Sequence, residues 1–202
     1  MRDGRAWEGV VDIPVNGRTR KPRQAGITMV IDKGLGLQET ADWLALAGDV
    51  IDFLKLGFGT SVFYSRELLQ RKVEICRQQA VSVYPGGTLA EVALLQGRFP
   101  SYLRYAYSLG IEAIEISDGT ITLSPAQRRA AIKAAQSEGF TVITEVGKKA
   151  LDEQLPIEDL WDQALLDLDA GASFVIVEAR ESGKGVGIYD AHGDLLEKAL
   201  PF

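Results

Sequence analysis

The sequence predicts an α/β fold built from six βα units in series. Six short runs rich in Val, Ile and Phe alternate with Gly-containing turns and with stretches of helical periodicity. The polar residues at the ends of these runs are 23, 29, 31, 30 and 33 positions apart, which is the length of a βα unit. Because the runs are continuously apolar rather than alternating, we expect a parallel sheet that is covered on both faces.

The predicted strands share a β-branched composition and a polar or charged residue at the carboxyl end. The spacings above are differences between Asp32, Lys55, Tyr84, Glu115, Glu145 and Glu178. The strands are ITMVID (27–32), VIDFLK (50–55), AVSVY (80–84), IEAIEIS (111–117), FTVITEV (140–146) and SFVIVEA (173–179).

The helices expected between the strands carry ordinary start and stop signals. In the stretch 124–139, Ser124 is the predicted N-cap and Gln127 stands at the capping-box position. The stretch 156–171 begins with proline and early acids, which suit the positive end of the helix dipole, and ends on Gly171. These signals predict helices that start and stop within the units defined by the strands.

Serial units of about 30 residues are typical of an open doubly wound sheet or of a (β/α)₈ barrel. A barrel needs about eight units and about 250 residues, whereas this chain of 202 residues has six units. No low-complexity linker marks a second domain, so we expect one domain over 1–202 with 1–25 as an N-terminal arm. The basic stretch 17–23 in this arm is either solvated or an anion contact.

Composition and charge restrict the class of protein. The chain is 46% hydrophobic and 25% charged, as is usual for a globular protein, and no apolar stretch approaches the roughly 20 residues needed to cross a bilayer. The N-terminus lacks a signal-peptide pattern, so we expect a cytoplasmic protein with no membrane partner. A formal charge of −6 argues against nucleic-acid binding. The single cysteine, Cys76, is expected to be a buried thiol.

In both architectures the functional face is the carboxyl end of the strands. Neighbouring strands lie about 5 Å apart, so carboxylates on adjacent strands can share a hard cation such as Mg²⁺, while lysines supply positive charge or a proton. This mixture favours a metal-assisted reaction on an anionic small molecule. No GxGxxG, Walker or HExxH motif is present. The residues concerned are Asp32, Lys33, Lys55, Tyr84, Pro85 to Thr88, Glu115, Ser117, Asp118, Glu145, Lys148, Glu178 and Arg180.

Six motifs in fixed order give the chain a family resemblance. They are KPRQAGITMVIDKGL, LKLGFGTS, YPGGT, EISDGTI, EVGKK and EARESGKGVGIYD, and they run from about residue 21 to residue 193. With these motifs the chain resembles phosphosulfolactate synthase, the enzyme that adds sulfite to phosphoenolpyruvate in coenzyme M biosynthesis. The resemblance implies a Mg²⁺-dependent TIM (β/α)₈-type barrel, of which about six βα units are present here and the C-terminal units are missing.

The resemblance also implies roles for the residues at the strand ends. Sulfite attacks C3 of phosphoenolpyruvate, charge develops on the carboxylate, and a proton is delivered to C2 to give 2-phospho-3-sulfolactate. We expect Glu115 and Glu145 to hold Mg²⁺, with Asp118 or Glu178 as alternatives, and Lys148 to act as the general acid because desolvation among cations lowers a lysine pKa. Lys33, Lys55 and Arg180 are then expected to bind the phosphate, the carboxylate and the sulfite.

Other interpretations stay open on the sequence alone. Loss of two barrel units weakens the expected phosphate site and exposes an apolar wall, which favours a homo-oligomer. The substrate is alternatively another enol phosphate or a sulfonate. A Schiff-base lyase with Lys55 or Lys148 as nucleophile, and a protein without catalytic activity, are two further alternatives.

Overall fold

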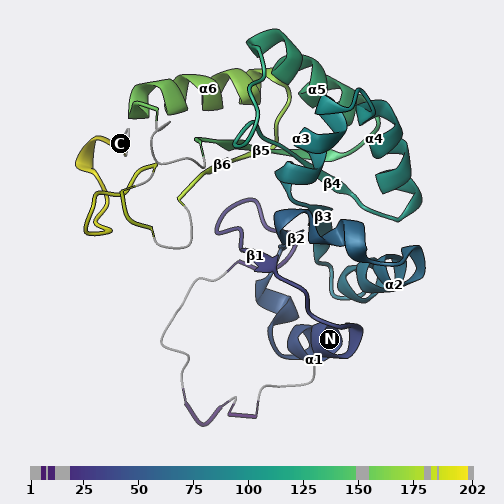
Figure 1. The fold of residues 1–202 in the computed structure, drawn as a ribbon. Coiled ribbons are helices and arrows are strands. Elements are labelled where there is room, and N and C mark those ends of the chain that lie inside the picture. The colour runs from purple at the N-terminus through teal and green to yellow at the C-terminus, as the bar shows by residue number, and fades with distance from the viewer. Residues whose placement is uncertain are drawn as a thin grey trace.

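The computed structural model describes residues 6–7, 9–11, 19–148, 155–179, 183–185 and 187–199 of the chain. All six predicted strands are confirmed, and each lies within one residue of its predicted segment (Figure 1). They are β1 (Met29–Asp32), β2 (Phe53–Leu56), β3 (Ser82–Pro85), β4 (Ala113–Ile116), β5 (Thr141–Val146) and β6 (Phe174–Val177).

Helices follow the strands as the sequence predicts. The capping box of α5 is confirmed, since the Ser124 hydroxyl accepts a hydrogen bond from the Gln127 N–H at 3.3 Å and the Gln127 side chain accepts one from the Ser124 N–H at 2.9 Å. Gly171 ends α6 in the left-handed conformation, with φ at 116°. The α helices are α1 (Leu37–Ala47), α2 (Arg66–Arg77), α3 (Gly87–Leu95), α4 (Phe99–Ser108), α5 (Pro125–Ser137) and α6 (Ile157–Ala170).

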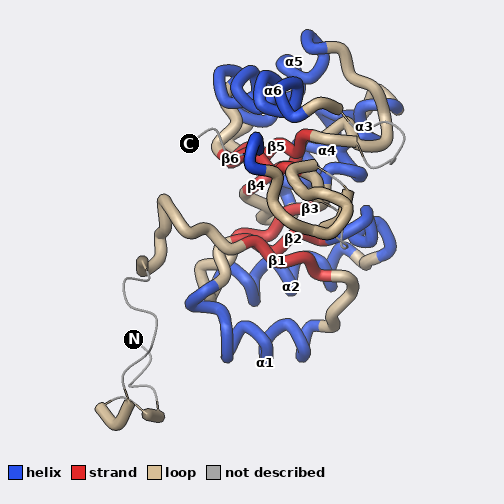
Figure 2. The backbone as a smooth tube through the Cα atoms, turned by 90° about the vertical axis from the view of Figure 1, so that its left-hand side faces the viewer, coloured by secondary structure: helices blue, strands red, loops and turns tan. Residues whose placement is uncertain are grey.

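The strands form two three-stranded parallel sheets, in the orders β1-β2-β3 and β4-β5-β6. β3 and β4 lie next to each other, and the helices lie on the outer side of the strands (Figures 1 and 2). Among the described strands no ladder joins β3 to β4 or β6 to β1. The structure therefore establishes the predicted α/β class with parallel sheets.

Apolar cores lie on both faces of the sheets, as the continuous apolar runs predict, although the outer strands β1 and β6 are less buried than β4 and β5. The larger core lies between the strands and the helices, and it includes the buried Cys76, whose pKa burial raises to about 12. A smaller core lies on the inner face, where the ring of Phe53 on β2 meets that of Phe174 on β6 with the centroids 5.5 Å apart. The inner faces of the two sheets thus pack against each other.

Two residues near the end of the N-terminal arm, Lys21 and Arg23, bind at the amino end of the sheet. Lys21 donates to the carbonyls of Gln79 and Ala80 at 3.1 and 2.8 Å, and Arg23 pairs with Asp52 at 2.8 Å. These partners precede β3 and β2, so Lys21 and Arg23 lie away from the carboxyl ends of the strands.

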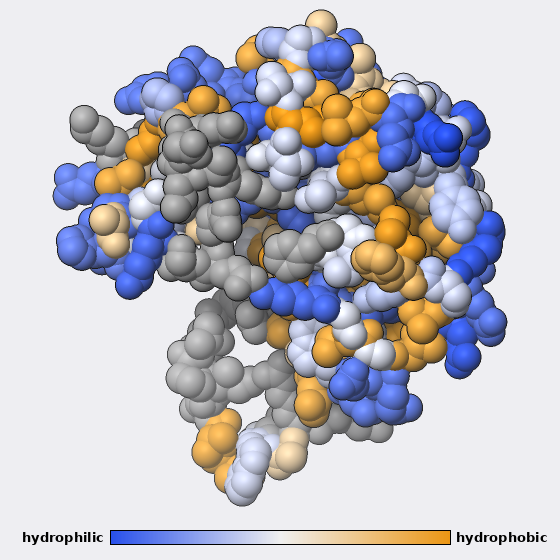
Figure 3. Space-filling view, viewed as in Figure 1, coloured by the Kyte–Doolittle hydropathy of each residue, from blue (hydrophilic) through white to orange (hydrophobic). Residues whose placement is uncertain are grey.

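The surface of the described residues carries both polar and apolar side chains. None of their helices is long and apolar enough to pass through a membrane. Apolar side chains gather on the face formed by α3, α4 and α5 (Figure 3), where Leu95 is 71% exposed. A hollow of about 460 Å³ on this face is lined by Leu94, Phe99 and Leu123 among others. Ile121 also lines this hollow, and its carbonyl accepts a hydrogen bond from Lys148, so the hollow borders the charged strand ends.

Candidate active site

A polar layer follows the apolar layer on the inner face of the sheets. Side chains alternate along a strand, so residues two apart share a face. Phe53 on β2, Ala113 on β4 and Ile143 on β5 belong to the inner core or pack against it. Two residues further along the same strands stand Lys55, Glu115 and Glu145, and Tyr84 is the strand partner of Lys55.

Lys55 lies between two buried carboxylates. Its Nζ is 2.9 Å from Glu115 Oε2 and 2.9 Å from Glu145 Oε2. The two glutamates are only 1% and 4% exposed. The structure thus brings together three of the predicted site residues, one from the first sheet and two from the second.

The start of α3 holds the other oxygen of Glu115. The N–H of Gly87 donates to Glu115 Oε1 at 2.7 Å. A β-carbon at position 87 would lie 2.2 Å from Ser117 Oγ and 2.7 Å from Glu115 Oε1. Glycine is needed here because the helix backbone approaches β4 too closely for any side chain.

Burial and neighbouring charges perturb the protonation of this cluster. Burial, reinforced by the charge of Glu145, raises the pKa of Glu115 to about 6, although Lys55 opposes the shift. Burial acts against the charged form of Lys55, but the two carboxylates outweigh it and the pKa of Lys55 is raised. Burial and the same two carboxylates raise the pKa of Tyr84 far above its usual value. Lys55 is therefore held as an ammonium and Tyr84 as a neutral phenol.

The carboxylates of this cluster fit a hard cation in chemical type. Glu145 Oε1 is buried and has no hydrogen-bond partner among the described residues. Mg²⁺ in proteins often has only one or two carboxylate ligands, with water or substrate oxygens completing its shell. Within the described ranges no group of three or more His, Cys, Asp or Glu side chains is arranged to hold a metal. The cluster thus supplies two carboxylates, of which Glu115 already has partners at both oxygens, in Gly87 and Lys55.

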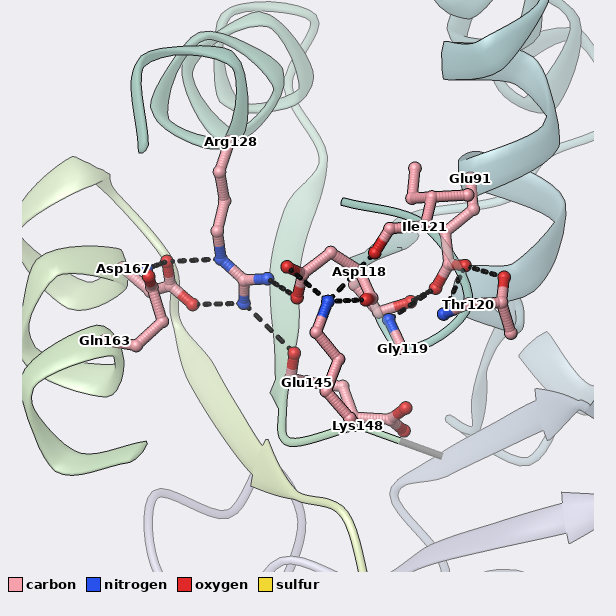
Figure 4. A network of polar contacts seen from close by, with 11 residues as sticks. Glu91, Asp118, Gly119, Thr120, Ile121, Arg128, Glu145, Lys148, Gln163 and Asp167 are labelled. Atoms are coloured by element: carbon pink, nitrogen blue, oxygen red, sulfur yellow. Dashed lines mark hydrogen bonds and ion pairs between the residues drawn. The ribbon is translucent and has the colours of Figure 1, made fainter. Parts of the chain in front are cut away.

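Lys148 belongs to a second network at the same strand ends (Figure 4). Its Nζ donates to the carbonyl oxygens of Asp118 and Ile121 at 2.6 and 2.9 Å, and to Asp118 Oδ2 at 3.1 Å. Asp118 Oδ1 accepts a hydrogen bond from Arg128 at 2.9 Å. The segment after β4 therefore orients the ammonium of Lys148.

The remaining predicted residues lie in different settings. Asp32 at the end of β1 is buried and forms an ion pair with Lys72 of α2, so it faces the helices rather than the inner cluster. Lys33 is exposed beside it, and Glu178 is half-buried after β6. Arg180 lies outside the described residues.

Two helix residues that sequence reasoning missed take part in the second network. Glu91 of α3 accepts hydrogen bonds from the segment 117–120, and Arg128 of α5 binds both Asp118 and Asp167. A signal was present in each case. Glu91 is the one acid in the apolar run GTLAEVALL, and Arg128 shares the buried face of its helix with Ala131 and Ala135.

A parallel α/β fold that gathers charged side chains at the carboxyl ends of its strands has the arrangement of an α/β enzyme. Residues 16–200 match the model of the (2R)-phospho-3-sulfolactate synthase (ComA) family. The chain belongs to this family, and it is accordingly an enzyme of the phosphosulfolactate synthase type. The family resemblance expected from the six motifs is confirmed.

Curated relatives named phosphosulfolactate synthase agree with this assignment. The protein of Methanocaldococcus jannaschii is 46% identical over 88% of this chain and 71% of its own length. That of Methanothermobacter thermautotrophicus is 43% identical over 89% and 70%, and that of Bacillus subtilis is 38% identical over 92% and 72%. The chain thus spans about seven tenths of the length of these relatives.

Solved structures share the fold at low sequence identity. Phosphonopyruvate hydrolase, solved in complex with oxalate and Mg²⁺, matches with a TM-score of 0.54 and 14% identity. The match covers 77% of this chain and 59% of that protein, so the chain spans about three fifths of it. This likeness supports the α/β fold.

Proposed function

We propose that the chain adds sulfite to C3 of phosphoenolpyruvate to give (2R)-2-phospho-3-sulfolactate. The observation that carries the proposal is the buried Lys55, Glu115 and Glu145 cluster, with Lys148 at the same strand ends, in a member of the phosphosulfolactate synthase family. The cluster offers positive charge to a small anionic substrate and carboxylate oxygens to a cation.

The reaction needs a cationic environment and one proton. The sulfur lone pair forms the bond to C3, the C2–C3 π electrons move toward C2 and the adjacent carboxylate, and a proton then bonds to C2. We propose that Lys55, Lys33 and Arg180 bind the substrate anions and that Lys148 delivers the proton. For this delivery, its contact with Asp118 Oδ2, at 3.1 Å, is exchanged for substrate.

We propose that Glu145 and Glu115 hold Mg²⁺. The partnerless Glu145 Oε1 supports this assignment, because a buried carboxylate oxygen is costly without a cation or a donor. Bound there, Mg²⁺ would supply positive charge at the substrate carboxylate. The ammonium of Lys55 already neutralises one of the two negative charges.

The raised pKa of Lys55 weighs against the Schiff-base alternative at that residue. A Schiff-base nucleophile must be a neutral amine, whereas two carboxylates stabilise the ammonium of Lys55. Borohydride trapping of a carbonyl substrate on Lys55 would support the alternative.

The test of the function is an assay of phosphoenolpyruvate consumption. We expect loss of the enol absorbance only when sulfite and Mg²⁺ are both present, and no loss after EDTA treatment. Lys148→Ala is expected to lower kcat by about 10² to 10⁴, the usual contribution of general acid catalysis. The exposed Lys133→Ala of α5 is the matched control. A Lys148→Ala variant with the parent rate would remove the assignment of the acid.

We propose further that the six units belong to a TIM (β/α)₈-type barrel. The helices lie outside the strands, and inner-face rings of β2 and β6 meet across the interior, which supports a curved sheet. Assaying this chain beside one that carries two further βα units tests whether six units suffice. Equal activity of the two would show that they do.

We also propose that the enzyme is cytoplasmic and forms a homo-oligomer. The exposed apolar residues Leu95 and Tyr107, 71% and 69% exposed, support the association of copies. Light scattering coupled to gel filtration measures the mass, and a monomeric mass at micromolar concentration would contradict the proposal.

A further inference from the structure

The segment Ser117–Ile121, which follows β4, carries three oxygens that accept hydrogen bonds from Lys148 (Figure 4). An ammonium has three protons, and this segment offers three oxygens to them. The direction in which Lys148 points therefore depends on the conformation of this short segment. Two buried side chains outside the strand ends, Glu91 and Arg128, bind this segment.

Glu91 holds the segment through hydrogen bonds to its backbone and hydroxyl groups. This residue of α3 is 0% exposed, and its carboxylate accepts hydrogen bonds from the N–H groups of Gly119 and Thr120, both at 3.0 Å. The hydroxyls of Ser117 and Thr120 also donate to it. A buried carboxylate costs free energy unless donors surround it, so these four donors stabilise Glu91. The same hydrogen bonds hold the segment in place.

Arg128 holds the segment through its hydrogen bond to Asp118. Its guanidinium binds both oxygens of Asp167 on α6, at 2.8 and 2.5 Å, and is 2% exposed. The remaining N–H groups reach Asp118 Oδ1 at 2.9 Å and the backbone carbonyl of Glu145 at 3.0 Å. One side chain thus joins α6, the segment after β4 and the end of β5. Asp118 is shared between Arg128 and Lys148.

We propose that Glu91 and Arg128 are positioning residues for the proton donor: they fix the Ser117–Ile121 segment so that it orients the Lys148 ammonium. The inference rests on the proposed role of Lys148. Neither residue touches the reacting atoms. Lysine in place of Arg128 keeps the charge but cannot serve Asp167, Asp118 and the Glu145 carbonyl together, because those contacts require a planar fork of donors.

The experiment compares Arg128→Lys and Glu91→Gln with two controls. Arg129→Lys is matched to the first, since Arg129 is the next residue of α5 and its ion pair with Asp169 is exposed. Glu74→Gln is matched to the second, since Glu74 pairs with Arg77 on the surface of α2. Kinetics and the rate of reductive methylation of Lys148, followed by mass spectrometry, are measured on each folded variant.

We expect Arg128→Lys and Glu91→Gln to lower kcat by about tenfold to hundredfold, as misplacement of a reacting group by about 1 Å does, while KM for phosphoenolpyruvate changes less. Methylation of Lys148 should become several-fold faster because the segment no longer restrains it. The controls should match the parent in both measurements. A uniform loss of stability would change KM and the labelling of other buried lysines, such as Lys72, as well.

Two outcomes would overturn the inference: folded variants with parental kcat, or folded variants with lower kcat and unchanged labelling of Lys148. If Glu91→Gln fails to fold, Thr120→Val replaces it, because it removes a single hydroxyl donor to Glu91, and if Arg128→Lys fails to fold, Asp118→Asn replaces it, because it weakens the contact of the segment with Arg128. The labelling needs no turnover. Absence of sulfite-dependent activity in the parent would therefore count against the proposed function, while the labelling still tests the positioning.

Discussion

The protonation of Glu115 sets how the cluster of Lys55, Glu115 and Glu145 responds to pH. Its pKa of about 6 in the folded chain lies above the ordinary value of 4.5, because burial and Glu145 disfavour the carboxylate. Between these two pH values the folded state binds more protons than the unfolded state, so this residue lowers stability as the pH rises. The burial of Glu115 thus lowers the stability of the folded chain near neutral pH.

Replacing Glu115 by glutamine should remove this dependence. We expect the free energy of unfolding of the parent, relative to Glu115→Gln, to fall by about 2 kcal/mol between pH 4.5 and pH 6 and to level off above it. Urea unfolding without Mg²⁺ at a series of pH values measures the difference. A constant difference over this range would show that Glu115 titrates normally.

Lys55 should contribute most to the free energy of unfolding above pH 6. Lys55→Met leaves two buried carboxylates without their cation, and removal of one partner of a buried ion pair costs about 3–5 kcal/mol. Below pH 6 the cost should be smaller, because protonation of Glu115 relieves the repulsion. Urea unfolding at pH 5 and pH 8 tests this, with the exposed Lys133→Met as control. An equal loss at both pH values would contradict the assignment.

At the scale of elements, the packing of α3 on β4 places both networks. Gly87 begins α3 and donates to Glu115, and Glu91 of the same helix binds the segment after β4. We expect Gly87→Ala to lower both stability and kcat, because its methyl group would overlap Ser117 and Glu115. Thermal unfolding and the sulfite assay measure the two losses.

Gly36→Ala is the control for this prediction. Gly36 precedes α1 with φ at −69°, and a β-carbon there meets only the flexible carboxylate of Glu39, at 3.3 Å. Its effect on kcat should be small. If Gly87→Ala behaved like Gly36→Ala, the close approach of α3 to β4 would not constrain the site.

The sequence predicted the helices and strands better than the side-chain contacts between them. Strand positions follow from local apolar runs and helix ends from local caps, and the position of Glu115 and Glu145 on neighbouring strands follows from the βα period. That Lys55 reaches both carboxylates depends on how two sheets face each other. Likewise, the partners of Arg128 lie 10, 17 and 39 residues away, and no local pattern encodes such distances.

At the scale of the whole molecule, the cluster of Lys55, Glu115 and Glu145 connects the two sheets. Lys55 belongs to the sheet β1-β2-β3, whereas Glu115 and Glu145 belong to β4-β5-β6. Phe53 and Phe174 make a second connection through the inner core. No ladder joins the two sheets among the described strands, so side chains hold them together, both at the inner face and in the larger outer core, which contains residues of both sheets.

Substrate bound at this cluster should therefore stabilise both sheets together. A ligand of the folded state at 100 times its Kd adds about 2.7 kcal/mol, which raises the Tm of a chain of this size by about 5–10 °C. With phosphoenolpyruvate and Mg²⁺ we expect slower hydrogen exchange in both β2 and β5. Mg²⁺ alone should slow the exchange less. In Lys55→Met, the substrate should no longer slow exchange in both sheets. Protection confined to one sheet would show that the substrate does not bridge Lys55 and the two glutamates.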